Sequence, residues 1–311
     1  MRLLVTGADG FVGRHLVRRL ARDGHQVTAA CRPGGQRVAW DPGVTQIPLE
    51  LTDDASVRAA TDTGPDSVVH LAAVASNRDA NADPGQAWVV NAAGTARLAE
   101  ALGRRRQAGK GDTRLLLVSS GEVYGREGGA PHRESDPVAP ASPYAASKAG
   151  AELAGLEVWR RTGLPVIIAR PFTHTGPGQE VRFVLPAFVA RMREARATGA
   201  RTVSSGNLDP VRDMLDVRDV VAAYVLLLQM GQPGETYNVS RGEGSSMREL
   251  FDRLATLLGV QVEPELDPTL ARAADIPHLV GDSIKLRRAT GWAPSRSLEQ
   301  TLRALVDAEA D

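Results

Sequence analysis

The stretch VTGADGFVG, residues 5–13, places three glycines, Gly7, Gly10 and Gly13, between an apolar run and an amphipathic run. The apolar run predicts a strand and the amphipathic run predicts a helix, so the glycines lie in a strand–turn–helix connection. Glycines at this spacing allow a tight turn, a close approach of backbone N–H groups to a pyrophosphate, and a helix N-terminus that faces its charge. The stretch therefore predicts a dinucleotide-binding turn.

Beyond this turn, short apolar runs alternate with helical runs through the first half of the chain. Strands are predicted at residues 2–6, 26–31, 44–51, 67–73, 114–120 and 165–170. Helices are predicted at residues 11–24, 88–105 and 142–163. Nearly continuous apolar strands separated by helices are typical of a parallel sheet that is covered on both faces. The predicted fold class is α/β, a doubly wound parallel sheet or Rossmann fold.

The pattern changes after Pro171, where a loop rich in Gly and Pro begins. Further helices are predicted at residues 183–196, 247–259, 282–291 and 297–309, and one short strand at 235–240 is expected to return to the sheet. These segments predict a smaller, mainly helical C-terminal substrate lobe. The expected division is a cofactor-binding domain at 1–171, completed by about 212–240, and a lobe made of 172–211 and 241–311.

Composition excludes several classes of protein. Lys+Arg and Asp+Glu both number 37 in 311 residues, so the net charge is zero, which argues against a nucleic-acid partner. One cysteine, Cys31, leaves no internal disulfide and no cysteine-based zinc site, and no metal site is predicted. Apolar runs are all shorter than the ~18–20 residues of a membrane span, and the N-terminus lacks a signal-peptide layout. We expect a cytoplasmic protein with no membrane partner.

The end of the second predicted strand bears on the choice of cofactor. An acidic residue there would hold the ribose 2′-OH of NAD. The chain instead has Cys31 followed by Arg32, and an arginine can pair with a 2′-phosphate. The sequence favours NADP(H) and leaves NAD(H) possible.

Tyr144 and Lys148 lie four residues apart at the start of a predicted helix, so they share one face. A free tyrosine titrates near ~10, and an ammonium one turn away would stabilise its phenolate and lower its pKa. Ser120, at the end of a predicted strand, could hold a substrate carbonyl beside this pair. The three residues predict proton transfer at a carbonyl or alkoxide.

TGADGFVG (6–13), HLAA (70–73), SSGEVYG (119–125), SPYAASK (142–148) and RPFTHTGPG (170–178) together resemble the extended short-chain dehydrogenase/reductase family of nucleotide-sugar epimerases, dehydratases and reductases. The resemblance implies a catalytic set of Ser120, Tyr144 and Lys148, with Tyr144 as proton donor or acceptor. It also implies a homodimer through the helices 88–105 and 142–163. The expected cofactor contacts are Gly7, Gly10, Phe11, Val12, Gly13, Arg32, Glu50, Leu51, Leu71, Ala72, Ala73, Tyr144, Lys148 and Pro171. The family usually has Asp where Glu50 stands.

The second half is similar to the GDP-mannose branch of this family in RPFTHTGPGQ (170–179), GNLDPVRDMLDVRDVVAAY (206–224) and GDSIKLRRATGWAP (281–294). A GDP-sugar is the implied substrate, and the arginines offer guanidinium forks for its diphosphate. The expected substrate contacts are Ser120, Thr173, His174, Arg182, Asn207, Leu208, Arg212 and Arg272. Thr173 replaces the asparagine that is usual in this motif.

Glu122 raises the question of which reaction follows. A dehydratase needs an acid/base carboxylate beside the strand-end hydroxyl, and Glu122 occupies that place, so it joins the candidate catalytic residues. The neighbouring position is Gly121, however, which brings no second polar side chain, and Ser120 stands where dehydratases carry threonine. We therefore expect an NADPH-dependent reductase that acts on the C4 ketone of a GDP-4-keto-6-deoxyhexose. A GDP-mannose 4,6-dehydratase, a nucleotide-sugar 4-epimerase and a redox-inactive NADP(H)-binding sensor or scaffold are the alternatives.

Overall fold

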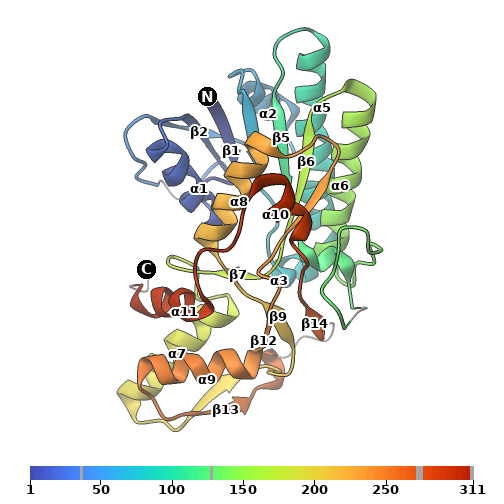
Figure 1. Ribbon diagram of the computed structural model, residues 1–311. Coiled ribbons are helices and arrows are strands. Elements are labelled where there is room, and N and C mark those ends of the chain that lie inside the picture. The colour runs from blue at the N-terminus through green and yellow to red at the C-terminus, as the bar shows by residue number, and fades with distance from the viewer. Residues whose placement is uncertain (36–37, 127–128, 271–275, 309–311) are drawn as a thin grey trace.

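The computed structural model of the chain describes residues 1–35, 38–126, 129–270 and 276–308. Its centre is a seven-stranded sheet in the order β11-β6-β5-β4-β1-β2-β3, in which every pair of neighbours is parallel (Figure 1). The strands are β1 (Arg2–Thr6), β2 (Gln26–Cys31), β3 (Val44–Pro48), β4 (Ser67–His70), β5 (Arg114–Val118), β6 (Val166–Pro171) and β11 (Thr236–Val239). All residues of β4 and β6 are buried, because helices cover both faces. The predicted doubly wound α/β fold is confirmed.

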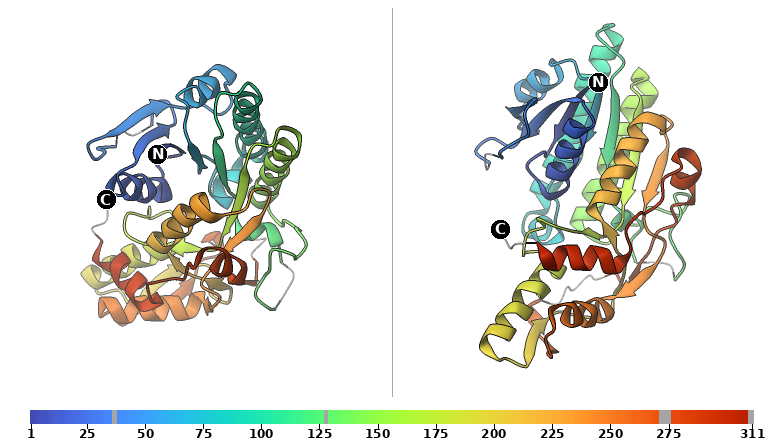
Figure 2. Two further views of the ribbon diagram at one scale, coloured as in Figure 1. Left: turned by 45° about the horizontal axis from the view of Figure 1, so that its top comes forward. Right: turned by 60° about the vertical axis from the view of Figure 1, so that its left-hand side comes forward.

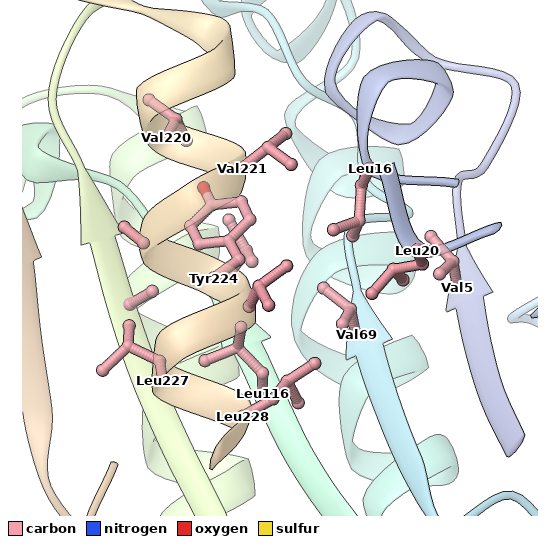
Figure 3. Close-up of a cluster of buried hydrophobic side chains, with 14 of the residues drawn as sticks. Val5, Leu16, Leu20, Val69, Leu116, Val220, Val221, Tyr224, Leu227 and Leu228 are labelled. Atoms are coloured by element: carbon pink, nitrogen blue, oxygen red, sulfur yellow. The ribbon is translucent and has the colours of Figure 1, made fainter. Parts of the chain in front are cut away.

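Two groups of helices cover the sheet. α1 (Phe11–Arg22) and α8 (Val217–Met230) pack on one face, where Val221 and Tyr224 of α8 lie on the side toward Leu16 and Leu20 of α1 (Figure 3). α2 (Asp54–Thr61), α5 (Gly94–Gln107) and α6 (Pro143–Thr162) supply the core of the other face. Each strand thus contributes alternate side chains to two separate cores.

The C-terminal lobe has a core of its own, formed mainly by α7 (Val184–Thr198), α9 (Met247–Leu258) and α11 (Leu298–Asp307). These helices lie together below the carboxyl ends of the central strands (Figures 1 and 2). Short strands accompany these helices: β7 (His174–Thr175), β8 (Thr202–Ser205), β9 (Val211–Asp213), β10 (Leu215–Asp216), β12 (Gly244–Ser246), β13 (Glu263–Leu266) and β14 (His278–Leu279). β7 pairs with β10, β8 pairs with β13, and β9 lies between β12 and β14 in a three-stranded sheet.

Several boundaries differ from the sequence prediction. Helix α2 was not predicted, and its signal is a local one: Asp53 caps its N-terminus by accepting from the N–H groups of Ala55 and Ser56. The helix predicted at 88–105 is assembled from α4 (Pro84–Trp88), a π-helical turn at Val89–Ala93, and α5. The predicted helix at 282–291 is the shorter α10 (Ile284–Thr290). Leu286 of α10 and Trp292 pack with α8 in the core of the sheet.

Among the described residues, no helix combines the length and apolar character needed to cross a membrane.

Asp219 joins the last part of the chain to the sheet. This buried carboxylate of α8 accepts hydrogen bonds from the backbone N–H and hydroxyl of Ser295 (3.1 and 2.6 Å) and from the backbone N–H and guanidinium of Arg296 (3.1 and 3.0 Å). The indole N–H of Trp292 donates to the backbone carbonyl of Asp219 (3.0 Å). The segment before α11 is therefore fixed to α8 by one side chain and one carbonyl.

We predict that Asp219→Ala lowers the free energy of unfolding by about 2–4 kcal/mol, because buried donors lose their acceptor. Urea denaturation followed by circular dichroism measures the change. The matched control is Asp252→Ala, which removes an exposed carboxylate paired with Arg248 and should change stability by less than about 0.5 kcal/mol. Equal effects of the two substitutions would contradict this role for Asp219.

Candidate active site

The glycine turn fits against the neighbouring strand end so closely that only glycine can be accommodated. Gly7 has φ +65°, and an added Cβ would lie 2.7 Å from the backbone nitrogen of Ala72. A Cβ on Gly13 would overlap the carbonyl oxygen of Gly7, so α1 packs directly on the turn. These are the first and third roles expected of a dinucleotide fingerprint, a tight turn and close helix packing.

The N-terminus of α1 is suited to an anion. Gly10 is its N-cap residue, no side chain caps the helix, and its first turn contains no acidic residue. Phe11 and Val12, predicted to contact a cofactor, begin this helix and are partly exposed. Uncapped N–H groups at the positive end of a helix dipole bind phosphate groups well. The residues present therefore fit a pyrophosphate-containing cofactor.

A buried chain of hydrogen bonds fixes the loop at Leu71, Ala72 and Ala73. The hydroxyl of Thr95 donates to the carbonyl of Asn91 (2.5 Å), so it can only accept from Nε2 of His70 (3.0 Å). Nδ1 of His70 then accepts from the hydroxyl of Thr6 (2.7 Å), and that hydroxyl accepts from the N–H of Ala72 (3.2 Å). Burial, and then the charge of Lys148, lower the pKa of His70 to about 3, which agrees with a neutral ring. The predicted cofactor loop is thus tied to β1.

Ser120, Tyr144 and Lys148 come together at the carboxyl ends of β5 and β6. The side chains of Ser120 and Tyr144 are hydrogen-bonded, and the ammonium of Lys148 donates to the carbonyl of Val118 at 2.6 Å. Ser142 caps α6 through the N–H of Ala145, which places Tyr144 in the first turn of the helix. The structure therefore brings these three side chains together, and their catalytic role stays a prediction.

Burial acts in opposite senses on the two titrating groups. It raises the pKa of Tyr144 above its ordinary value, the nearby carboxylate of Glu122 raises it further, and the hydrogen bond with Ser120 lowers it. Burial lowers the pKa of Lys148 to about 8, and Glu152 partly offsets this effect. In the protein without bound ligands, Tyr144 is therefore a protonated phenol at neutral pH, and Lys148 is predominantly charged.

Glu122 lies in a short 3₁₀ turn, Gly121–Tyr124, that begins directly after Ser120. Its carboxylate accepts from the side-chain amide of Asn77 (2.8 Å), which belongs to α3 (Asn77–Ala82). A Cβ on Gly121 would lie 3.1 Å from three ring atoms of Phe172. The position beside Glu122 therefore has no room for a larger side chain unless the ring of Phe172 moves.

The other predicted cofactor residues lie at neighbouring strand ends. Arg32 is exposed directly after β2, and its charge acts on the carboxylate of Glu50, which accepts from the N–H and hydroxyl of Thr52 (2.9 and 2.7 Å). Leu51 is buried against Gly94 of α5, and Pro171 is the buried last residue of β6. The sheet order thus brings the predicted cofactor residues to one edge.

The predicted substrate residues are less closely grouped. Thr173 and His174 follow β6, and the ring of His174 is stacked on Phe11 (6.3 Å between centroids). Arg182, before α7, is exposed and bonded to Asp79 (2.9 Å) and Glu180 (2.8 Å). Arg212 of β9 donates to the carbonyls of Val211 (2.9 Å) and Ile276 (2.7 Å).

Asn207 and Leu208 lie between β8 and β9, where Asn207 is exposed and accepts from the N–H of Asp209 (3.0 Å). Arg272 falls outside the described residues.

Sequence reasoning missed residues that hold the site without carrying a familiar motif. Asn91 lies in the π-helical turn before α5, and its amide binds both the backbone of Val74 (2.7 and 3.1 Å) and the hydroxyl of Ser147 (2.9 Å). Ser147 in turn donates to the carbonyl of Tyr144 (2.8 Å). Asn91 and Asn77 become visible only once the strand ends are assembled, although Asn91 stands in a predicted helix at an otherwise apolar position.

Comparison with known proteins agrees with this geometry. Residues 3–240 match the model of the NAD dependent epimerase/dehydratase family. The chain belongs to this family. It is 36% identical over 98% of its length to a GDP-6-deoxy-D-mannose reductase from Pseudomonas aeruginosa, of which it covers 96%. This membership confirms the resemblance to the extended short-chain dehydrogenases/reductases.

Solved structures of family members superpose over nearly the whole chain. The RMD protein of Pseudomonas aeruginosa, solved in complex with NADPH, matches with a TM-score of 0.82 and 35% identity over 98% of this chain and 97% of that one. A UDP-glucose 4-epimerase from Thermotoga maritima, solved with UDP-glucose, matches with a TM-score of 0.90 and 27% identity over 99% and 98%. The family fold thus extends through the C-terminal lobe.

We predict that Gly7→Ala lowers the free energy of unfolding more than Gly24→Ala does, by at least about 1–2 kcal/mol. Both glycines have positive φ, so both substitutions carry the cost of about 1–2 kcal/mol for a left-handed residue. A Cβ on Gly24 meets nothing within 4 Å, whereas one on Gly7 meets the backbone of Ala72. Urea denaturation of the two variants isolates the close approach, and equal losses would contradict it.

Proposed function

We propose that the protein reduces the C4 ketone of a GDP-4-keto-6-deoxyhexose to an alcohol. Bound NADPH would supply the hydride. The hydroxyl of Tyr144 donates the proton to the carbonyl oxygen, and Ser120, already hydrogen-bonded to Tyr144, donates to the same oxygen once the substrate is bound. Lys148, held by the carbonyl of Val118, stabilises the phenolate that remains. Hydride and proton together account for the two hydrogens of the product alcohol.

The observation that carries the choice of a reductase is the packing at Gly121. A dehydratase must also remove a proton at C5 and expel the C6 hydroxyl, which requires polar side chains beside the strand-end hydroxyl. Here the ring of Phe172 occupies the space next to Gly121, and the carboxylate of Glu122 is engaged by Asn77. The raised pKa of Tyr144, due first to burial, supplies the protonated phenol that a reduction begins with.

The cofactor preference and the substrate class rest on further observations. Arg32 stands exposed at the end of β2, where a 2′-phosphate would lie, and the similar protein from Pseudomonas aeruginosa was solved with NADPH. The GDP-sugar is supported by the identity to the GDP-6-deoxy-D-mannose reductase. Arg182, Arg212, Thr173 and His174 remain the proposed sugar-nucleotide contacts.

A UDP-sugar 4-epimerase is the second candidate, because the chain is also 33% identical to a UDP-glucose 4-epimerase from Mycolicibacterium smegmatis over 99% of its length. Three assays separate the reactions. NADPH with GDP-4-keto-6-deoxymannose should lose NADPH absorbance and yield a GDP-6-deoxyhexose by mass spectrometry. Water loss from GDP-mannose without net cofactor consumption would identify a dehydratase, and interconversion of UDP-glucose and UDP-galactose would identify an epimerase. No turnover in any assay would favour a redox-inactive sensor or scaffold.

We predict that Tyr144→Phe lowers kcat/KM for the reduction by about 10²–10⁴-fold, the usual contribution of a positioned general acid. Steady-state kinetics with NADPH and the keto sugar measures the loss. Tyr237→Phe is the matched control, because Tyr237 is buried on β11 and its hydroxyl accepts only from the backbone of Gln232 among the described residues. A kcat/KM of Tyr144→Phe close to the wild-type value would exclude the proposed mechanism.

The pH dependence of the reduction follows from Lys148. Burial lowers the pKa of its ammonium to about 8, so the charge is present below pH 8 and is lost as the pH rises through that value. Since kcat/KM reports groups of the free enzyme, we predict a plateau below pH 8 and a fall of about tenfold per pH unit above it. A profile that stays flat to pH 10 would contradict a role for the Lys148 charge.

A further inference from the structure

A buried ion pair lies one helical turn beyond Lys148. Arg170 of β6 donates to both carboxylate oxygens of Glu152 on α6, at 2.8 and 2.6 Å, and both residues are only 5% exposed. The guanidinium of Arg170 also lies over the ring of Tyr124, at 4.8 Å from its centroid. The hydroxyl of Tyr124 donates to Asn238 (2.6 Å), so the pair is enclosed between β6, β11 and α6.

Such a pair adds little to stability, because the cost of removing two charges from water offsets their attraction. Its field acts strongly on a neighbouring charge, however, because little water is present to screen it. Glu152 follows Lys148 by four residues on α6, so the two side chains share one face of the helix. Lys148 is itself only 6% exposed, and its ammonium has no carboxylate partner within 4 Å among the described residues.

Lys148 is surrounded by groups from several elements. Tyr144 and Glu152 lie on α6, the neutral His70 lies on β4, Glu122 follows β5 beyond Tyr144, and Arg170 on β6 lies behind Glu152. Burial acts against the charge of Lys148, whereas Glu152 favours it and raises its pKa. Arg170 carries the opposite charge to Glu152, so it weakens this support.

We propose that Glu152 is a positioning residue that keeps the Lys148 side chain charged, and that Arg170 sets how strongly it does so. The consequence for catalysis rests on the proposed reduction, but the electrostatic effect itself does not. The titration of Lys148 can be measured directly, because the chain contains only three lysines, Lys110, Lys148 and Lys285.

The experiment titrates the full-length protein labelled with ¹³C at the lysine Cε and follows the three signals by NMR. Lys110→Arg and Lys285→Arg assign the two exposed or half-exposed lysines, so Lys148 is assigned by elimination. Glu152→Gln should lower the midpoint of Lys148 by roughly one pH unit or more, because a buried opposite charge is lost while Arg170 remains. The double variant Glu152→Gln/Arg170→Met should recover much of this shift, because it removes the buried cation as well.

The double variant also guards against misfolding, since buried ion pairs are often replaced by neutral side chains of similar size without loss of stability. Glu152→Asp should keep the midpoint near the wild-type value, because it retains the charge. Glu157→Gln is the matched control one turn further along α6, where the exposed carboxylate pairs with Arg161. The titration midpoint of Lys148 should not change in Glu157→Gln.

A midpoint in Glu152→Gln equal to the wild-type value, or a double variant that falls as far as the single one, would overturn the proposal. One of these two results is expected if the ion pair has only a structural role. In the reductase assay, the fall of kcat/KM above pH 8 should move to lower pH in Glu152→Gln and return in the double variant. Absence of reductase activity with the NMR shifts intact would reject the proposed function alone, whereas activity without the shifts would reject this inference alone.

Discussion

The contact between the backbone of Gly7 and the backbone of Ala72 is the constraint on which the site depends. It sets the distance between the turn after β1 and the loop after β4, and only glycine fits there. β4 lies between β1 and β5, so the contact also fixes the cofactor turn relative to the strand end that carries Ser120. A parallel sheet brings its strand ends to one edge, and this contact gives that edge its spacing.

From this contact, a chain of polar side chains leads to α6, the helix that carries Tyr144. Thr6 and His70 hold the loop after β4, Thr95 connects His70 to Asn91, and Asn91 reaches Ser147 beside Tyr144. Every link is buried or partly buried, where an unsatisfied polar group costs about 1–3 kcal/mol. The position of Tyr144 therefore depends on β1, β4, α5 and α6 together.

The sequence predicted well what depends on contiguous residues. The glycine spacing, the apolar strands and the Tyr144–Lys148 interval are local patterns, and they indicated the sheet, its helices and the placement of Tyr144 and Lys148 on one helix face. It predicted poorly what depends on assembly. The Glu152–Arg170 pair joins residues 18 apart that looked like ordinary helix and strand positions, and the short strands of the lobe pair segments as distant as β8 and β13. Helix α2 was missed because eight residues carry too little periodicity.

Arg182, a predicted substrate contact, already has ion-pair partners in the structure. The residue is exposed and bonded to two carboxylates, one of them Asp79, so it connects α3 to the segment before α7. Exposed ion pairs contribute only about 0–1 kcal/mol, because water competes for both partners. A diphosphate offers more acceptor oxygens than either carboxylate and a similar charge-assisted geometry. Exchanging Asp79 for a phosphate therefore costs little, and the present pairing of Arg182 is compatible with the substrate role proposed for it.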